Sequence, residues 1–380
     1  MSKAPIKILH VVFSLEPGGM ENGLVNVARA LSPAEFEIHV CCLERGGSFV
    51  ERLPDPNRLS ILGKPPGFSW KTIWRLAREI SRVSPDVIHT HNLGPLIYSS
   101  LATLFGTTRC ILHGEHGLPN DQCTPPFLRQ RRWLYRCCRT VHTVSQGLFE
   151  QLIELRLNAK EIVVVLNGVD TERFSVAPNK TEARQKIGLP SNGPVIGIVG
   201  RFEGRKRHPI LIDAFARLTQ QIPSAQLLIV GDGGLDREKV HEQIHSNPAA
   251  RQIHLAGFQK KPRPFYQAMD LLIVPSIVEG MSNAVLEAMA CGVPVLAHVA
   301  CGNSEMIRSG ENSFLADIST ADQIYDELIK ILGDANRLGK MGDMARKTVV
   351  ENFSIHTMVK NYAALYRRLA KRNPSASLPQ

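Results

Sequence analysis

Two glutamates, Glu279 and Glu287, have seven residues between them in a glycine-containing segment whose residue types suit a phosphorylated sugar. The segment, 275–295, begins at the end of an apolar run, crosses a loop and enters a helix near Ser282 or Asn283. Free backbone N–H groups and the positive dipole end make a helix start a ready phosphate site. Carboxylates accept hydrogen bonds from vicinal sugar hydroxyls. For either glutamate alone, an ordinary surface or dipole-stabilising role is the stronger interpretation; the whole string favours a ligand.

A second group of charges follows another apolar run, in the segment Val199-Gly-Arg-Phe-Glu-Gly-Arg-Lys206. Arg201 offers a planar fork of donors and Lys206 a point charge, so together they can neutralise a pyrophosphate. Arg205 and Arg207 lie in the same loop, which leaves Arg205 as an alternative to Lys206. A solvated basic loop is the common fate of such a run and is the competing interpretation.

Gly18 and Gly19 precede a helical pattern, where glycine permits close approach of a ligand to the backbone. An ordinary turn into a helix explains them equally well, and the surrounding residues do not fit a G-x-G-x-x-G dinucleotide fingerprint.

Histidines also gather at predicted strand ends, as His113 and His116 after one apolar run and His89 and His91 after its neighbour. The His-x-x-His spacing of the first pair could hold a metal ion, but the loop supplies no third ligand. Packing or supporting hydrogen bonds are the usual role of such histidines, and this is the expectation for His89 and His91.

Short apolar runs alternate with helical patterns along most of the chain, which is typical of βαβ units and a parallel sheet. The strands expected in the first half are 6–13, 36–43, 86–90, 109–113, 140–145 and 162–166. Those expected in the second half are 195–200, 225–230, 253–256, 271–275 and 293–296. Ligands of open α/β sheets bind beyond the carboxyl ends of the strands. Each cluster described above lies just after one of these runs.

A chain of 380 residues usually forms more than one domain, and the break in the alternation predicts two doubly wound, Rossmann-like α/β domains. We expect an N-terminal domain at 1–170, a hinge at 171–194 and a C-terminal domain at 195–353. A helix at 354–372 should pack back on the N-terminal domain, and 373–380 should be a disordered tail.

The net charge of +10 suits nucleic acid, an anionic membrane or a phosphorylated ligand. A nucleic-acid partner is not expected, because the chain lacks a recognition motif and interleaved aromatics. The segment 127–139 carries five arginines with Trp133 and Tyr135, as helices that touch an anionic membrane surface do. A solvated, packed helix fits this pattern equally well.

No apolar stretch reaches the ~18 residues of a membrane span, and the first apolar run, Ile6 to Phe13, is too short for a signal peptide. The cysteines show no C-x-x-C spacing. A cytoplasmic protein, peripheral on the inner face of the membrane, is therefore the expectation.

The string from Glu279 to Glu287 resembles the E-x7-E signature of family 4 glycosyltransferases. The resemblance covers nearly the whole chain and includes the segments 17–19, 86–91, 167–170, 199–206 and 230–233. It implies the GT-B arrangement, in which two Rossmann-like domains face each other across a cleft.

The resemblance also assigns residue roles. It implies that Glu279 contacts donor-sugar hydroxyls, Glu287 the ribose diol, and Arg201 with Lys206 the diphosphate. A histidine faces the donor sugar in this family; His116 matches best and His113 is the alternative. The implied catalytic residues are His116, Arg201, Lys206 and Glu279, and the implied donor-binding residues are Gly18, Gly19, Arg201, Lys206, Glu279, Gly280, Met281, Ser282, Asn283 and Glu287.

By resemblance, the chain would be a retaining glycosyltransferase that moves a sugar from a nucleotide-sugar, with UDP the commoner base, to a glycan or lipid-linked acceptor. No Asp-x-Asp occurs, so neither a metal nor a cofactor is expected, and Arg201, Lys206 and the helix start would stabilise the leaving diphosphate. The stretch 18–26 resembles sugar transferases of exopolysaccharide clusters, which suggests exopolysaccharide or cell-envelope glycan synthesis.

Three alternatives remain at this point. A nucleotide-sugar epimerase would act without an acceptor, and a glycan phosphorylase would need free phosphate. A non-catalytic sugar-nucleotide-binding protein would bind the ligand without turnover.

Overall fold

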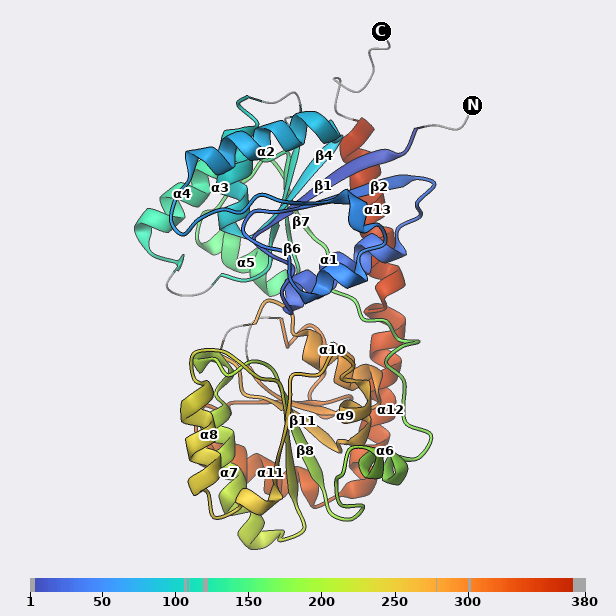
Figure 1. Cartoon of the computed structure of the whole chain (residues 1–380). Helices are drawn as coiled ribbons and strands as arrows, with labels where there is room; N and C mark the ends of the chain where they lie inside the picture. Colours follow the sequence, from blue (N-terminus) through green and yellow to red (C-terminus); the bar gives the residue numbers. More distant parts are fainter. Residues whose placement is uncertain are drawn as a thin grey trace. The chain divides into compact units, whose positions relative to one another are not determined.

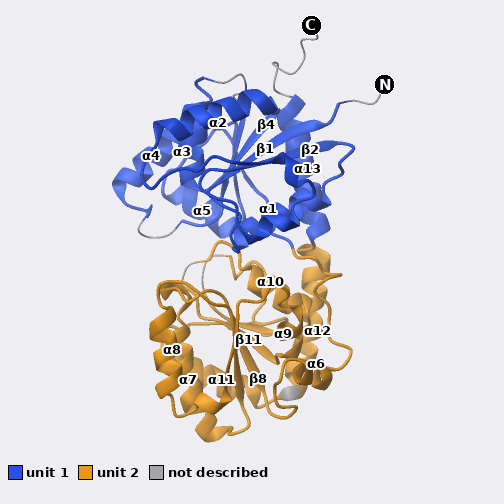
Figure 2. Cartoon of the chain, in the orientation of Figure 1, with its two compact units in different colours: residues 1–168, 355–380 blue, residues 169–354 orange. Residues whose placement is uncertain are grey.

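The computed structural model describes residues 4–105, 108, 110–118, 122–277, 279–299 and 302–371. It divides the chain into two compact units (Figure 2). Unit 1 combines Met1–Gly168 with Ile355–Gln380, and unit 2 is Val169–Ser354. Each unit is a parallel sheet covered by helices, so the predicted fold class is confirmed.

The sheet of unit 1 has the strand order β3-β2-β1-β4-β5-β6-β7, with all neighbours parallel. The strands are β1 Ile6–Val12, β2 Phe36–Cys42, β3 Leu59–Ile61, β4 Val87–His91, β5 Ile111–Glu115, β6 Thr140–Thr143 and β7 Ile162–Val164. The polar Ser60 interrupts β3, so this strand is not an apolar run and was not predicted from the sequence.

Helices cover both faces of this sheet, as Figure 1 shows. They are α1 Gly19–Ala30, α2 Trp70–Val83, α3 Leu93–Ala102, α4 Pro125–Tyr135, α5 Gln146–Glu154 and α13 Ile355–Lys371. Ser69 begins α2 by accepting a hydrogen bond from the Thr72 N–H (3.3 Å), and apolar residues at helical spacing turn one face of α2 into the core.

The C-terminal helix α13 returns to unit 1 and packs against α1 and β1. Met358, Tyr362 and Tyr366 enter the same core as the strands. This is the helix expected at 354–372; the tail expected at 373–380 lies outside the described residues.

The sheet of unit 2 has the order β10-β9-β8-β11-β12-β13, again parallel throughout. The strands are β8 Val195–Val199, β9 Gln226–Val230, β10 Ile253–Gly257, β11 Leu271–Val274, β12 Val295–His298 and β13 Phe314–Ala316. The helices are α6 Lys180–Lys186, α7 His208–Gln221, α8 Arg237–Ser246, α9 Arg263–Ala268, α10 Asn283–Ala290, α11 Ala321–Leu332 and α12 Ala335–Asn352. The core lies mainly between the sheet and α7, α8 and α11.

The stretch expected as a hinge, 171–194, is instead folded into unit 2. Within it, α6 packs beside α9, and the buried guanidinium of Arg184 bonds to Asp270 and to the Ala268 carbonyl (3.1 Å). These bonds attach the short, charged α6 to unit 2. The boundaries between the units fall at Gly168/Val169 and at Ser354/Ile355.

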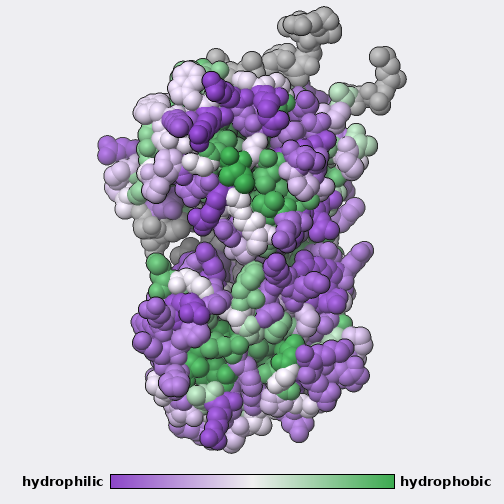
Figure 3. All heavy atoms as spheres, viewed as in Figure 1, coloured by the Kyte–Doolittle hydropathy of each residue, from purple (hydrophilic) through white to green (hydrophobic). Residues whose placement is uncertain are grey.

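Across the described ranges, none of the helices has the length and apolar character needed to cross a bilayer. On the face drawn in Figure 3, hydrophilic residues cover most of each unit and apolar residues show between them.

Candidate functional site

The two predicted donor-binding loops of unit 2 lie side by side because the strands before them are neighbours. In the sheet, β8 pairs with β11, so the loops after Val199 and Val274 leave the same edge. A backbone hydrogen bond from the Ile277 N–H to the Arg205 carbonyl (3.1 Å) joins them. The strand order therefore brings together two charged segments that are about seventy residues apart in sequence.

An ion pair between Lys206 and Glu279 forms the centre of this arrangement. Lys206 lies in a short 3₁₀ turn, Gly204–Lys206, and Glu279 follows β11. Both side chains are largely buried, at 15% and 10% exposed. Burial acts to raise the pKa of Glu279, but the Lys206 ammonium outweighs it and lowers the pKa, so the carboxylate stays ionised.

Two arginines extend the positive charge around this pair. Arg205 lies 3.8 Å from Glu279, and both Arg205 (2.8 Å) and Arg201 (2.5 Å) pair with Glu203. Arg201 and Arg205 remain about half exposed, whereas Lys206 is turned inward toward Glu279. The loop therefore presents two accessible guanidinium groups next to one sheltered ammonium.

The helix α10 begins directly beyond Glu279. Ser282 is its N-cap and Asn283 its first residue, and no acidic side chain occupies its first turn. The first N–H groups of a helix lack intrahelical partners, so this end carries partial positive charge. Gly280 and the buried Met281 connect Glu279 to the helix.

Glu287 lies one helical turn further along α10 and is half-buried. Its neighbour is the buried phenol of Tyr266 on α9, whose pKa is raised by burial and by the Glu287 charge. The structure thus places Glu287 on the same helix as Ser282 and Asn283, but outside the Lys206–Glu279 pair.

Two residues of this region have features that the sequence did not indicate. Gly302 has a φ of +85°, and a Cβ there would lie 1.7 Å from the Gly280 carbonyl oxygen, so only glycine fits against the loop of Glu279. Arg207 has a left-handed φ of +55°, and its Nη1 is buried without a hydrogen-bond partner among the described residues. A non-glycine residue in this conformation is uncommon and clusters at functional sites. In the sequence, Arg207 was one cation among several.

The other predicted site residues, Gly18, Gly19 and His116, belong to unit 1. Gly18 is the N-cap of α1 in an extended conformation and Gly19 is the first helical residue. His116 follows β5 and is half-buried, and burial lowers its pKa to about 4. It lines a cavity of about 10 Å³, the space of one water molecule, together with residues of β1, β4, α1 and α13.

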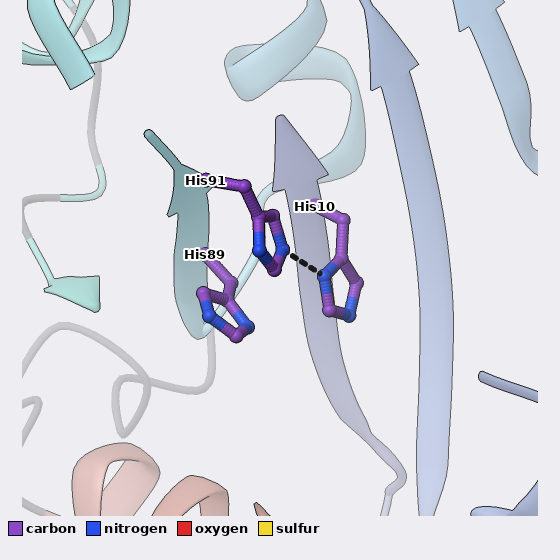
Figure 4. A group of neighbouring side chains, drawn as sticks. All are labelled: His10, His89 and His91. Atoms are coloured by element: carbon purple, nitrogen blue, oxygen red, sulfur yellow. Dashed lines mark hydrogen bonds between the residues drawn. The ribbon is translucent and has the colours of Figure 1, made fainter. Parts of the chain in front are cut away.

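Three further histidines line the same cavity, and Figure 4 shows His10 on β1 beside His89 and His91 on β4. Sheet register explains this grouping, because His10 is paired with His89, and His91 lies two residues further on the same face. His91 bonds to His10 through Nε2 and to His116 through Nδ1, both at 2.9 Å. The predicted supporting role of His89 and His91 thus takes the form of direct contacts with other histidines.

One ring nitrogen each from His10, His89 and His91 lies within 4.8 Å of the others, a spacing close to that of a metal site. The ring planes are inclined by 13° to 39° to one another. However, His10 Nδ1 and His91 Nε2 are already joined by a hydrogen bond (2.9 Å), which a metal ion held between these rings would have to replace. We interpret the group as a hydrogen-bonded network.

His113, the alternative to His116, lies on the opposite face of the sheet. It is fully buried and bonded to Thr90 (2.9 Å), and it does not line the cavity. Glu115 is on this face too, bonded to Arg131 (3.2 Å) and Tyr135 (2.7 Å). Burial alone would raise the pKa of Glu115, but His113, Arg131 and Tyr135 lower it to about 2.

This pairing corrects one part of the prediction for 127–139. Arg131 is one of the five arginines of that segment, but it is fully buried in α4 and neutralised by Glu115. The exposed basic face of α4 is correspondingly smaller.

Two family models match the sequence: one described as Glycosyltransferase Family 4 over residues 17–173, the other as Glycosyl transferases group 1 over residues 179–348. A D-inositol 3-phosphate glycosyltransferase of Gordonia bronchialis is 31% identical over 373 residues, covering 94% of this chain and 77% of that protein. The Escherichia coli UDP-Gal:alpha-D-GlcNAc-diphosphoundecaprenol alpha-1,3-galactosyltransferase is 25% identical over 380 residues, covering 95% and 96%. The crystal structure of Anabaena Alr3699/HepE with UDP-glucose matches with a TM-score of 0.83 at 22% identity, covering 96% of this chain and 100% of that one.

Proposed function

We propose that this chain, which belongs to glycosyltransferase family 4, transfers a sugar from a nucleotide-sugar bound in unit 2. The transfer is proposed to retain the anomeric configuration and to need no metal ion. The observation that carries this proposal is the Lys206–Glu279 pair, with Arg205 at 3.8 Å, at the ends of two adjacent strands beside the start of α10. Together these groups form one compact site that can bind a diphosphate and sugar hydroxyls.

Lys206, Arg201 and the first N–H groups of α10 would bind the diphosphate. An ammonium has three N–H donors, so Lys206 can bond to Glu279 and to a phosphate oxygen together. Glu279, held ionised by Lys206, would accept hydrogen bonds from the donor sugar, and Glu287 from the ribose diol. His116 is proposed to meet the donor sugar from unit 1.

In the transfer step, the bond from the anomeric carbon to the diphosphate oxygen breaks while the acceptor hydroxyl oxygen forms a new bond on the same face. The departing diphosphate takes the electron pair of the broken bond and then the proton of the acceptor hydroxyl. The cations of unit 2 stabilise the charge that develops on it, which is where fixed donors contribute most. No protein nucleophile is required.

Two measurements test this chemistry. Transfer should continue in excess EDTA, since Lys206 and Arg201 supply the positive charge; complete loss that only Mg²⁺ or Mn²⁺ restores would contradict metal independence. The anomeric configuration of the product, read by NMR, should equal that of the donor. An inverted product would contradict retention.

For the donor we propose a UDP-sugar. The HepE structure holds UDP-glucose and the E. coli relative is named for UDP-Gal, which supports this choice. A thermal-shift screen of UDP-, GDP- and ADP-sugars should raise the melting point most with a UDP-sugar, because a ligand that binds the folded state stabilises it. Interconversion of the donor without acceptor would instead indicate an epimerase, and binding without turnover a non-catalytic protein.

For the acceptor we propose a glycan or lipid-linked saccharide of exopolysaccharide or cell-envelope synthesis, in line with the diphosphoundecaprenol acceptor in the E. coli relative's name. Such an acceptor lies at a membrane. We therefore propose that unit 1 contacts an anionic membrane surface peripherally.

The structure offers a surface for this contact that the sequence analysis did not single out. Phe68, Trp70, Trp74, Leu104 and Phe105, the aromatic patch, are each more than half exposed. Their rings touch in two pairs, Phe68 with Trp70 (5.2 Å) and Trp74 with Phe105 (4.9 Å), while Trp70 and Trp74 share one face of α2 at i, i+4 spacing. Lys71, Arg75 and Arg78 are exposed on the same helix, and such a combination of aromatics and cations suits an anionic bilayer.

Vesicle co-sedimentation can separate this patch from α4. A Trp70→Ser/Trp74→Ser variant should bind anionic vesicles several-fold more weakly than the unmodified chain. Trp133→Ser removes an equally exposed tryptophan from α4 and is the matched control. Weaker vesicle binding by the Trp133→Ser control alone would indicate that α4 makes the contact. Absence of vesicle binding by the unmodified chain would contradict membrane contact.

A further inference from the structure

A continuous series of hydrogen bonds crosses the core of unit 1 and ends at His116. We call it the histidine chain; its members, in order, are His142, His89, Tyr366, His10, His91 and His116. The linking distances are His142 Nε2 to His89 Nε2 2.9 Å, His89 Nδ1 to Tyr366 Oη 2.8 Å, Tyr366 Oη to His10 Nε2 3.5 Å, His10 Nδ1 to His91 Nε2 2.9 Å, and His91 Nδ1 to His116 Nε2 2.9 Å. All members except His116 are fully buried.

These imidazoles are neutral at physiological pH. Burial lowers the pKa of His10 to about 3 and that of His116 to about 4, and it lowers the pKa of the remaining three histidines well below 6.5. A neutral imidazole has one N–H and one lone pair. A histidine that accepts at one nitrogen must therefore donate from the other, so the direction of one bond determines the direction of the next.

Only two directions are then available, and the far end of the chain distinguishes them. His142 Nδ1 is buried, and no acceptor among the described residues meets it at hydrogen-bonding distance and angle. The Thr143 backbone acts to raise the pKa of His142, but less than burial, His116 and His113 lower it. If the chain ran from His116 to His142, this atom would carry an unpaired buried N–H. If it ran the other way, the atom would be an unpaired acceptor, which proteins tolerate more readily than an orphaned N–H.

We propose that the histidine chain runs from His142 to His116 and fixes His116 as the tautomer that carries its proton on Nδ1. Each member donates to the next, and His91 Nδ1–H donates to His116 Nε2. The free Nδ1–H of His116 then serves as a hydrogen-bond donor to a substrate oxygen, and His116 is not a base. His10 and His91 are positioning residues. This role rests on the proposed function, which places His116 at the donor sugar.

The groups that face His116 agree with a neutral donor. His91 and His142 are uncharged neighbours, and Glu115, the adjacent carboxylate, is already committed to Arg131 and Tyr135. Gly114 leaves room for this arrangement, since a Cβ there would lie 2.6 Å from His142 Nε2 and 3.0 Å from His116 Nε2.

Nitrogen-15 NMR of the imidazole rings tests the tautomer without any transfer assay. The His116 signals, assigned by their loss in His116→Asn, should show a protonated Nδ1 and a bare Nε2 at pH 7 and still at pH 6. An Nε2–H tautomer, or an imidazolium at pH 6, would overturn the proposal. So would stoichiometric binding of Zn²⁺ by these rings.

Substitutions of His10, which is separated from His116 by one member of the histidine chain, test the positioning role. His10→Asn retains an N–H donor close to the position of Nδ1 and should leave the tautomer of His116 unchanged. His10→Phe removes the donor at similar size and should give a mixture of tautomers. An unchanged, single tautomer in a folded His10→Phe variant would overturn the role of the chain.

Transfer assays then test the donor role. His116→Asn keeps an amide donor and should stay within tenfold of the unmodified chain, whereas the isosteric His116→Asp, which only accepts, should lose about 10²–10³-fold in kcat. His39→Asn, a histidine of unit 1 outside the chain, is the matched control. Equal transfer by the Asn and Asp variants would overturn the donor role. Since the NMR result does not depend on transfer, failure of the tautomer and failure of the proposed function are distinguishable.

Discussion

Both units gather polar residues, beyond the strand ends in unit 2 and mostly within the strands in unit 1, but they stabilise them in opposite ways. In unit 2 the centre is charged: Lys206 and Glu279 pair with each other, and exposed arginines lie beside them. In unit 1 the centre is neutral, because burial removes the charge from His10, His91 and the other histidines and leaves them to bond to one another. Half-exposed arginines beside a buried ion pair can be used to bind an anion, whereas buried neutral rings are suited to orienting a donor.

The largest expected effect comes from removing the sheltered cation of unit 2. Lys206→Met should lower kcat by about 10³-fold, because the departing diphosphate loses a fixed positive charge. Lys239→Met, an exposed lysine of α8, is the matched control and should transfer normally. Near-normal transfer by Lys206→Met would mean that the charged centre of unit 2 is not the diphosphate site.

A smaller loss is expected from crowding the backbone of unit 2. Gly302→Ala should destabilise the unit by about 3 kcal/mol and weaken nucleotide-sugar binding, since the added Cβ meets the Gly280 carbonyl. Gly233→Ala has a similar positive φ of +70° but no atom within 4 Å of its Cβ, so it should cost only about 1 kcal/mol. Chemical denaturation and isothermal titration of both variants measure the difference. Equal behaviour of the two would show that the contact of Gly302 with the loop of Glu279 is unimportant.

The most gradual effect is the response of unit 1 to acid. The folded-state pKa of His10, about 3, is below its unfolded value of 6.5, so the unfolded chain takes up a proton first. Stability is therefore full above pH 6.5 and falls as the pH drops toward 3, by about 1.4 kcal/mol per pH unit for each such histidine. Glu115, with a pKa of about 2, adds a further loss below about pH 4.5.

The tryptophans make this loss measurable, because Trp70, Trp74 and Trp133 all belong to unit 1. The urea midpoint followed by tryptophan fluorescence should fall clearly between pH 7 and pH 5. A midpoint that stays constant over this range would show that the histidines of unit 1 are not held neutral.

The charged centre was accessible from the sequence, and the neutral one was not. Two short segments contain Glu279, Lys206 and the start of α10, and the order of residues within each segment predicts the site. The strands before these segments are strongly apolar. Strands β3 and β13 were missed because they are three residues long and, unlike the equally short β7, do not lie in a longer apolar run. The stretch 171–194 was mistaken for a hinge because α6 is short and charged, and its attachment to unit 2 depends on Arg184 and Asp270, which are 86 residues apart.

The histidine chain depends on which strands are neighbours and in what register. His10 and His89 become partners through the pairing of β1 with β4, and His142 joins them through β6. Nothing in the local sequence of any one strand encodes this register, and His89 and His91 were expected only to pack or to support other residues. Tyr366 comes from α13, more than two hundred residues further along the chain.

The central claim is that unit 2 holds the donor through Lys206, Arg201 and the start of α10, with Glu279 on the sugar. A crystal structure of the chain soaked with a UDP-sugar in the presence of EDTA tests it most directly. The diphosphate should lie within hydrogen-bonding distance of Lys206 and of the first N–H groups of α10. Density for the nucleotide-sugar away from residues 199–206 and 276–287 would contradict it.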